Sequence, residues 1–106
     1  MWWSNEQAFF NQDVRGMMHF PGFGVDAAKL LIQERNIAGI GIDTHGVDAG
    51  RDTGFTINRL MLEQPRIVLE NLTNLEQLPA TGIILVIGVL RLRCGSGSPA
   101  SVVALL

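Results

Sequence analysis

The sequence has one cysteine, few charged residues and no long apolar run, and each shortage excludes a class of protein. A single cysteine, Cys94, excludes an internal disulfide and fits a reducing compartment such as the cytoplasm. The longest apolar stretch, from Ile83 to Leu90, is broken by Gly88. It is far shorter than the roughly 20 residues of a membrane-spanning helix. The net charge of −2 gives no electrostatic attraction to nucleic acid or to an anionic membrane, so we expect neither partner.

The balance of apolar and charged residues predicts a folded chain with little polar surface. Apolar residues make up 47% of the chain, which excludes disorder, and charged residues only 17%. We therefore expect self-association, for example as a dimer, or a covering partner. A length of 106 residues without repeat or linker predicts a single domain over residues 1–106. The first residues lack a basic region followed by an apolar run, so we expect no signal peptide.

The order of the predicted elements is typical of an α/β fold. Apolar residues recur at helical spacing in two segments, and short apolar runs mark the strands. Asn36 is the expected end of the first helix, and Thr53 is the expected cap of the second. Gly39 and Gly41 leave one strand face bare, which allows another backbone to approach closely. The predicted helices are 25–35 and 55–62, with one turn near 6–11, and the predicted strands are 37–43, 66–69, 82–93 and 102–106.

The loop after the strand at 37–43 holds the first candidate ligands. Asp43, His45 and Asp48 have the residue types and spacing of a zinc or manganese site. Alternatively, Asp43 and Asp48 accept hydrogen bonds from backbone amides, which is the commoner role of aspartate in loops. His19, between Met18 and Phe20, is interpreted as a packed histidine.

Two features near the C-terminus carry weaker signals. Cys94 follows Arg93, which can lower the pKa of a thiol, but an inert thiol is the commoner case. The run Gly95-Ser96-Gly97-Ser98 can present backbone amides to an anion, although a turn between two strands is the better interpretation.

Glu70 directly follows the predicted strand 66–69. Because such a strand ends inside a fold, we expect the Glu70 carboxylate to be partly buried. A buried carboxylate is costly unless it is paired, hydrogen-bonded or bound to a metal. One alternative to a metal is that Glu70 caps the following turn by accepting bonds from the amides of Asn71, Thr73 or Asn74.

Five segments occur in an order that resembles the cyclase family, which includes bacterial kynurenine formamidases and isatin hydrolases. The most specific is Glu70-Asn71-Leu72-Thr73-Asn74-Leu75-Glu76-Gln77-Leu78-Pro79. The other four are Phe20-Pro21-Gly22-Phe23, Gly39-Ile40-Gly41-Ile42-Asp43-Thr44, Asp48-Ala49-Gly50 and Gly95-Ser96-Gly97-Ser98-Pro99. The resemblance covers nearly the whole chain.

The resemblance implies a metal-dependent hydrolase of amide or lactam C–N bonds that uses zinc or manganese. It also implies a β/β/α fold of the swivelling type with a mixed, barrel-like sheet, of which this chain is the C-terminal part. The main metal motif of the family, His-x-Gly-Thr-His-x-Asp, is absent from this sequence. An arginine that the family pattern implies near Ser101 is also absent.

Two residues match a second pair of ligands in two-metal members of the family. Glu70 matches the glutamate of that pair, and Asn58 stands where those members have histidine. An amide is a poor substitute for imidazole toward zinc or manganese. The resemblance therefore implies metal positions at Glu70 and Asn58 but too few ligands for activity by the chain alone.

Two functions from different classes follow. The chain is either the C-terminal part of an amidohydrolase, or a non-catalytic interaction module that covers its apolar faces in a dimer or on a full-length relative. An in-frame segment encoding the missing metal motif upstream of Met1 would favour the first, and a soluble dimer would favour the second.

Overall fold

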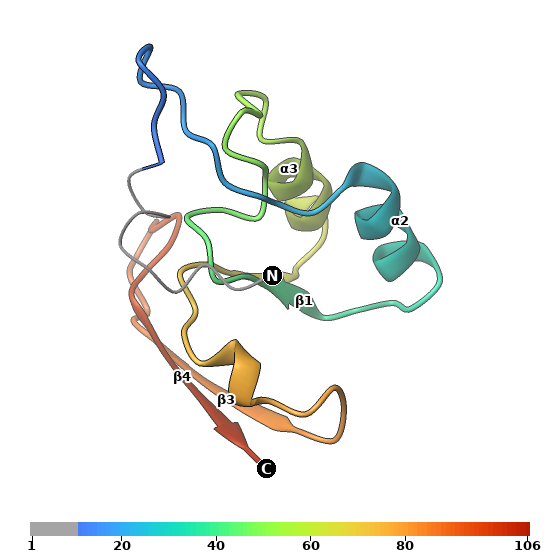
Figure 1. Cartoon of the computed structure of the whole chain (residues 1–106). Helices are drawn as coiled ribbons and strands as arrows, with labels where there is room; N and C mark the ends of the chain where they lie inside the picture. The colour runs from blue at the N-terminus through green and yellow to red at the C-terminus, as the bar shows by residue number, and fades with distance from the viewer. Residues whose placement is uncertain (1–10) are drawn as a thin grey trace. The chain divides into compact units, whose positions relative to one another are not determined.

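The structure is a computed structural model that describes residues 11–106 (Figure 1). The chain forms two compact units, residues 1–75 and 76–106. The turn predicted near 6–11 lies outside the described residues except for Asn11. The first unit contains α2 (Val25–Gln33), β1 (Gly39–Gly41), α3 (Thr56–Leu62) and β2 (Ile67–Leu69). A short 3-10 turn at Leu75–Gln77 follows, and the second unit contains β3 (Ile84–Val89) and β4 (Ala100–Leu105).

Helix α2 confirms the prediction from helical spacing. Ala28 is buried, while Leu31 and Ile32 pack beside it at the edge of the core. Asp26 lies in the first turn, where a negative charge interacts favourably with the helix dipole. Asn36 adopts a left-handed conformation, with φ of 45°, three residues after the helix ends. Asparagine tolerates this conformation better than most residues, but the helix ends at Gln33, earlier than the predicted end at residue 35.

The strands β1 and β2 are parallel, with Gly39 opposite Ile67 and Gly41 opposite Leu69. Parallel neighbours need a crossover connection, and α3 lies within it. A Cβ atom on Gly39 would overlap the backbone carbonyl of Ile67, and one on Gly41 would lie 2.7 Å from the Leu72 side chain. The expected close approach of another backbone is therefore confirmed at Gly39, whereas the close neighbours of Gly41 are side chains.

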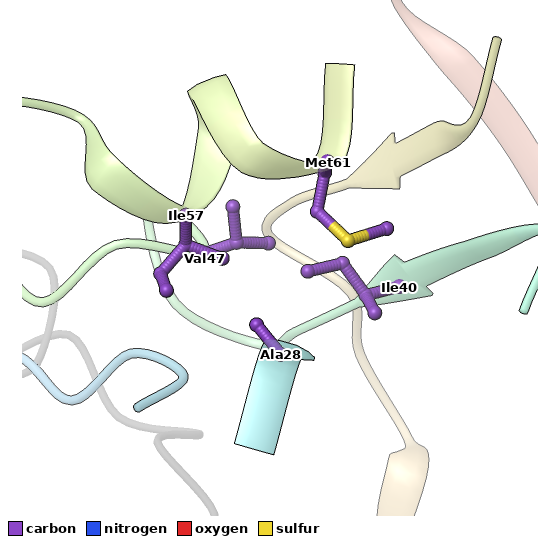
Figure 2. Close-up of a cluster of buried hydrophobic side chains, with 5 residues drawn as sticks. All are labelled: Ala28, Ile40, Val47, Ile57 and Met61. Atoms are coloured by element: carbon purple, nitrogen blue, oxygen red, sulfur yellow. The ribbon is translucent and has the colours of Figure 1, made fainter. Parts of the chain in front are cut away.

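The core of the first unit is small and gathers side chains from four segments (Figure 2). In Figure 2 these side chains point toward one another from α2, β1, α3 and the loop between β1 and α3. Partly buried apolar residues surround them. The buried residues are Ala28, Ile40, Val47, Ile57 and Met61.

The segment 20–23 packs along the loop 47–50, so two of the motifs that carried the family resemblance contact each other. The amide of Phe23 donates to the carbonyl of Val47 over 2.8 Å, and the amide of Gly50 donates to the carbonyl of Phe20 over 2.9 Å. A Cβ atom on Gly22 would overlap the backbone of Asp48 and Ala49. Glycine at position 22 is therefore required by this close packing.

Gly22→Ala is expected to destabilise the first unit by about 3 kcal/mol, at the upper end of the cost of overpacking, because the obstructing atoms belong to the backbone. Urea unfolding followed by circular dichroism measures this loss. Gly97→Ala is the control, because a Cβ atom there meets nothing within 4 Å. Equal stabilities of the two variants would contradict the steric explanation.

The second unit is a two-stranded antiparallel sheet in which β3 pairs with β4. The prediction of a strand over 82–93 is right in position but too long, since β3 ends at Val89. The chain turns back between β3 and β4, which confirms the hairpin interpretation of residues 95–98.

The expected barrel-like sheet is not supported. The described residues form two separate two-stranded sheets, β1–β2 and β3–β4, and neither closes on itself. Closing a sheet needs more strands than these, about eight in common small barrels. The α/β character of the fold is confirmed, but the expected mixed sheet is not seen among the described residues, since one sheet is parallel and the other antiparallel.

Candidate functional site

Backbone hydrogen bonds place Glu70 opposite the loop that follows β1. The amide of Ile42 donates to Leu69 over 3.0 Å, and the amide of Asn71 donates to Thr44 over 2.9 Å. These bonds extend the β1–β2 pairing past the ends of both strands. Asn71 then adopts a left-handed conformation with φ of 56°, so the chain turns away from the sheet directly after Glu70.

The Glu70 side chain is exposed, contrary to the expectation of partial burial, because the chain turns at the surface. Its Oε1 lies 3.7 Å from the position that a Cβ atom on Gly46 would occupy. Among residues 11–106 the carboxylate accepts no hydrogen bond, and the Asn71 amide is bonded to Thr44 instead. The capping interpretation of Glu70 is therefore wrong.

Asp48 performs the capping that was expected of Thr53. Its side chain is buried, with the residue only 4% exposed, and its two oxygens accept bonds from the amides of Ile57 and Asn58 at the start of α3. Asp52 adds bonds from the amides of Gly54 and Thr56. Carboxylates at this end of a helix satisfy free amides and interact favourably with the helix dipole.

Asn58 is held by the same carboxylate. Its side-chain Nδ2 donates to Asp48 Oδ2 over 2.8 Å, and its backbone amide reaches the same oxygen over 3.1 Å. Asp48 and Gly46 belong to one loop, so the residues proposed as metal positions, Asn58 and Glu70, both lie against residues 44–48. The expectation that Asp48 accepts bonds from backbone amides is therefore confirmed, but the amides belong to α3, nine and ten residues away, and not to its own loop.

A metal site built from Asp43, His45 and Asp48 is not formed. The part of the chain that the structure describes contains no group of three or more potential ligands of this kind. The two oxygens of Asp48 are used by α3, and the ring of His45 packs edge-on against Phe20 with centroids 5.6 Å apart. Asp48 thus has the structural role given as the alternative, and His45 makes an aromatic contact.

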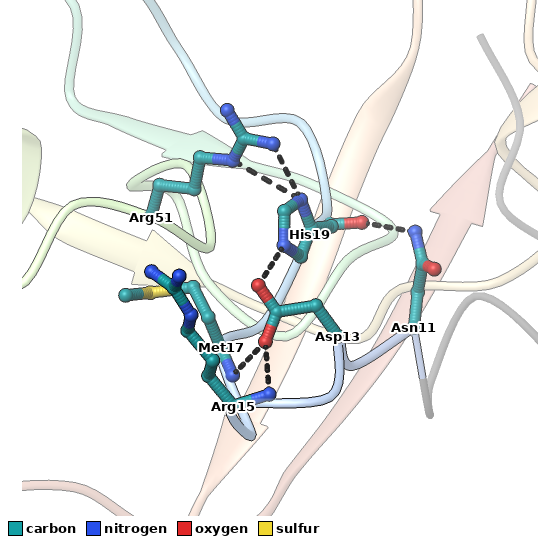
Figure 3. A network of polar contacts seen from close by, with 6 residues as sticks. All are labelled: Asn11, Asp13, Arg15, Met17, His19 and Arg51. Carbon is teal, nitrogen blue, oxygen red and sulfur yellow. Dashed lines mark hydrogen bonds and ion pairs between the residues drawn. The ribbon is translucent and has the colours of Figure 1, made fainter.

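His19 belongs to a polar network rather than to a packed apolar environment (Figure 3). Its Nδ1 accepts bonds from Arg51 Nε and Nη2 over 3.0 and 2.9 Å. Its Nε2 lies 3.0 Å from Asp13 Oδ2. Because an arginine can only donate, these contacts select the tautomer with the proton on Nε2. The prediction of a packed histidine is therefore wrong, because both ring nitrogens are bound by polar side chains, one of them from Arg51, 32 residues away.

Two aspartates, the exposed Asp13 and the partly exposed Asp52, have lowered pKa values for local reasons. The bond from His19 lowers the pKa of the Asp13 carboxyl most, followed by the amides of Met17 and Arg15. The hydroxyl of Thr56 and then the amide of Gly54 lower the pKa of Asp52. Both groups stabilise local turns and neither lies at Glu70.

Over residues 11–106, no helix is both long and apolar enough to cross a membrane.

Comparisons with known proteins agree on one family. The model described as "Putative cyclase" matches residues 1–49. The isatin hydrolase of Roseibium aggregatum is 37% identical over 106 residues, covering 96% of this chain and 40% of that protein. The chain therefore spans about two fifths of the length of this relative.

Solved structures give the same result. Isatin hydrolase A from Labrenzia aggregata, bound to benzyl benzoate, superposes with a TM-score of 0.86 at 36% identity, covering 94% of this chain and 40% of that one. Isatin hydrolase A from Ralstonia solanacearum gives a TM-score of 0.84 at 37% identity over 92% of this chain and 38% of that one. The mixed α/β fold is thus the fold of the matched part of these hydrolases.

Proposed function

Because the chain belongs to the cyclase family, we propose that it is the portion of a metal-dependent hydrolase of amide or lactam C–N bonds that carries Glu70 and Asn58. In this proposal the chain forms the C-terminal part of a β/β/α domain, and other segments complete the barrel-like sheet of that domain. Alone, the chain is inactive. The expected setting is the cytoplasm, with a small amide as the substrate of the complete site.

One observation carries this proposal. The Glu70 carboxylate is exposed beside Gly46 and accepts no hydrogen bond from residues 11–106, so it is available to a ligand. Structural roles of carboxylates normally consume their oxygens, as Asp48 illustrates in the same loop. An available glutamate directly after a strand supports a binding role over a structural one.

The described residues do not fit a complete zinc or manganese site. A catalytic zinc takes three protein ligands and a water, whereas this region offers Glu70 and the amide oxygen of Asn58. The remaining ligands must come from another segment. What these residues themselves do is limited: Glu70 presents a negative charge, and Asp48 fixes the orientation of the Asn58 amide.

The isolated chain is expected to hold far less than one metal ion per molecule after dialysis against zinc or manganese. It is also expected to show no hydrolysis of isatin or of N-formyl aromatic amines. Elemental analysis and absorbance assays measure the two outcomes. Glu70→Ala is the matched control, and the residual metal of the two proteins should agree. If each wild-type chain retained about one metal ion and Glu70→Ala lost it, the explanation that the chain is inactive because metal ligands are missing would be refuted.

A second candidate function is a non-catalytic interaction module. It is favoured by the exposed apolar side chains of β3 and β4. Such a module would associate with itself or with a full-length relative, and neither nucleic acid nor a membrane is an expected partner. A stable, metal-free homodimer in solution would favour this candidate over the hydrolase portion.

A further inference from the structure

His19 connects two segments that lie far apart in the sequence. Its side chain is 26% exposed. As Figure 3 shows, Asp13 contacts one nitrogen of the ring and Arg51, from the loop before α3, contacts the other. Directly beside this contact, the amide of Gly50 donates to the carbonyl of Phe20 over 2.9 Å. The contact between His19 and Arg51, called the latch below, therefore reinforces a junction that the backbone also makes.

The latch requires a neutral imidazole. Because Arg51 can only donate, Nδ1 must offer a lone pair, and the single ring proton is on Nε2. A second proton can be added only at Nδ1. It would point at the guanidinium, so a cation would stand where an acceptor stood and both donors of Arg51 would lose their partner. Protonation of His19 is therefore incompatible with the latch.

The contact with Asp13 responds differently to a proton. The bond from His19 holds the pKa of the Asp13 carboxyl below its ordinary value, so this group stays ionised wherever histidine titrates. A protonated imidazole still donates to the carboxylate through Nε2, and the bond between two charged groups is stronger. Acid therefore breaks the contact with Arg51 and leaves the contact with Asp13.

We propose that the latch is a pH-dependent device that fastens the loop 47–51 while His19 is neutral and releases it in mild acid. Histidine changes its charge between about pH 5 and 8, so the change falls within the physiological range. Asp48, in the same loop, caps α3 and holds the Asn58 side chain. Release thus loosens the support of position 58. The proposal rests on the contacts of His19 and not on metal binding or activity.

Other ionisable side chains belong to the segments that meet at the latch. Arg15 cannot lose its charge in a protein. Asp48 and Asp52 are directed to the start of α3, where they accept bonds from backbone amides. His45 is the second histidine of the chain and packs edge-on against the residue that follows His19. Because His45 titrates in the same range, a variant has to separate its effect from that of His19.

Amide hydrogen exchange of the whole chain, corrected for the intrinsic pH dependence of exchange, tests the latch. We expect protection of the Gly50 amide to fall about tenfold between about pH 7.5 and pH 5.5, the size expected for losing one charge-assisted hydrogen bond. The Ile42 amide, which donates to Leu69, is the internal control and should keep its protection. Nitrogen-15 NMR should show Nδ1 of His19 unprotonated at the higher pH. Constant protection of Gly50, or a proton on Nδ1 at the higher pH, would overturn the proposal.

Two variants assign the pH response to one histidine. In His19→Asn the amide oxygen stands near the place of Nδ1 and can accept from Arg51, but it does not titrate. Gly50 should therefore stay protected at both pH values. His45→Gln removes the other histidine and should keep the response of the wild type. A response that persists in His19→Asn, or that disappears in His45→Gln, would contradict the latch.

Asp13→Asn tests the tautomer on which the latch depends. The variant keeps one oxygen for the amides of Arg15 and Met17, but its NH₂ group then faces Nε2 of His19. The ring proton must move to Nδ1, where it opposes Arg51 even at the higher pH. We expect the Gly50 amide to have low protection at both pH values. Protection equal to that of the wild type at the higher pH would show that Asp13 does not set the latch.

Discussion

Replacing Asp48 by alanine is expected to destabilise the first unit by about 3 kcal/mol, a large part of the total stability of a small domain. The residue is buried, and its carboxylate accepts bonds from the amides of Ile57 and Asn58 and from the Asn58 side chain. Alanine leaves these donors without a partner in a partly buried place. Hydrogen bonds to a charged group contribute about 1.5–3 kcal/mol each, and contributions that share one group do not add fully.

Two further variants separate this explanation from general disruption. Asp48→Asn keeps one oxygen but turns an NH₂ group toward other donors. Its free energy of unfolding should therefore lie between those of the wild type and Asp48→Ala. Asp52→Ala removes bonds to the same helix end from a residue that is only partly buried and should cost clearly less than Asp48→Ala. Denaturant unfolding ranks the three variants. A cost for Asp52→Ala as large as that for Asp48→Ala would show that burial of the cap is unimportant.

Local patterns predicted the elements well where short-range physics decides them. The apolar spacing of α2 depends on neighbouring residues and is confirmed, although the helix ends at Gln33, two residues before the predicted end. The bare face of Gly39 correctly indicated a close backbone neighbour, which the structure identifies as Ile67 of β2. At Gly41 the close neighbour is the Leu72 side chain instead of a backbone.

The candidate site was predicted less well because its contacts are remote in sequence. The roles of Asp48 and His19 depend on α3 and on Arg51, which is 32 residues from His19, and no spacing rule connects them. Glu70 was expected to be buried because it follows a strand, but the left-handed turn at Asn71 directs the chain along the surface. Its match to a metal position came only from the family resemblance, and it stays a prediction.

Asn58→His is expected to raise the zinc affinity of the chain when the remaining part of a cyclase-family chain is co-expressed. Asp48 Oδ2 lies 2.8 Å from the Asn58 side-chain nitrogen. An imidazole at this position can donate its Nδ1 proton to the same oxygen, which leaves Nε2 free as a ligand. Carboxylates orient metal-binding histidines in this way in many proteins. We expect at least about a tenfold gain in affinity, which corresponds to 1.4 kcal/mol.

Three comparisons make this result specific to the two proposed positions. Adding Glu70→Ala to Asn58→His should abolish the gain, because the second ligand is then lost. Adding Asp48→Asn instead should reduce the affinity about 10–100-fold, the usual effect of losing an orienting carboxylate. Asn74→His is the control. It also replaces an asparagine by histidine, but Asn74 makes no hydrogen bond to Asp48, which Asn58 does. Metal content by elemental analysis and competition with a chromogenic chelator measure each case without any need for activity. If Asn58→His and Asn74→His bound zinc equally, the introduced histidine would act as a surface ligand, and position 58 would have no role in a metal site.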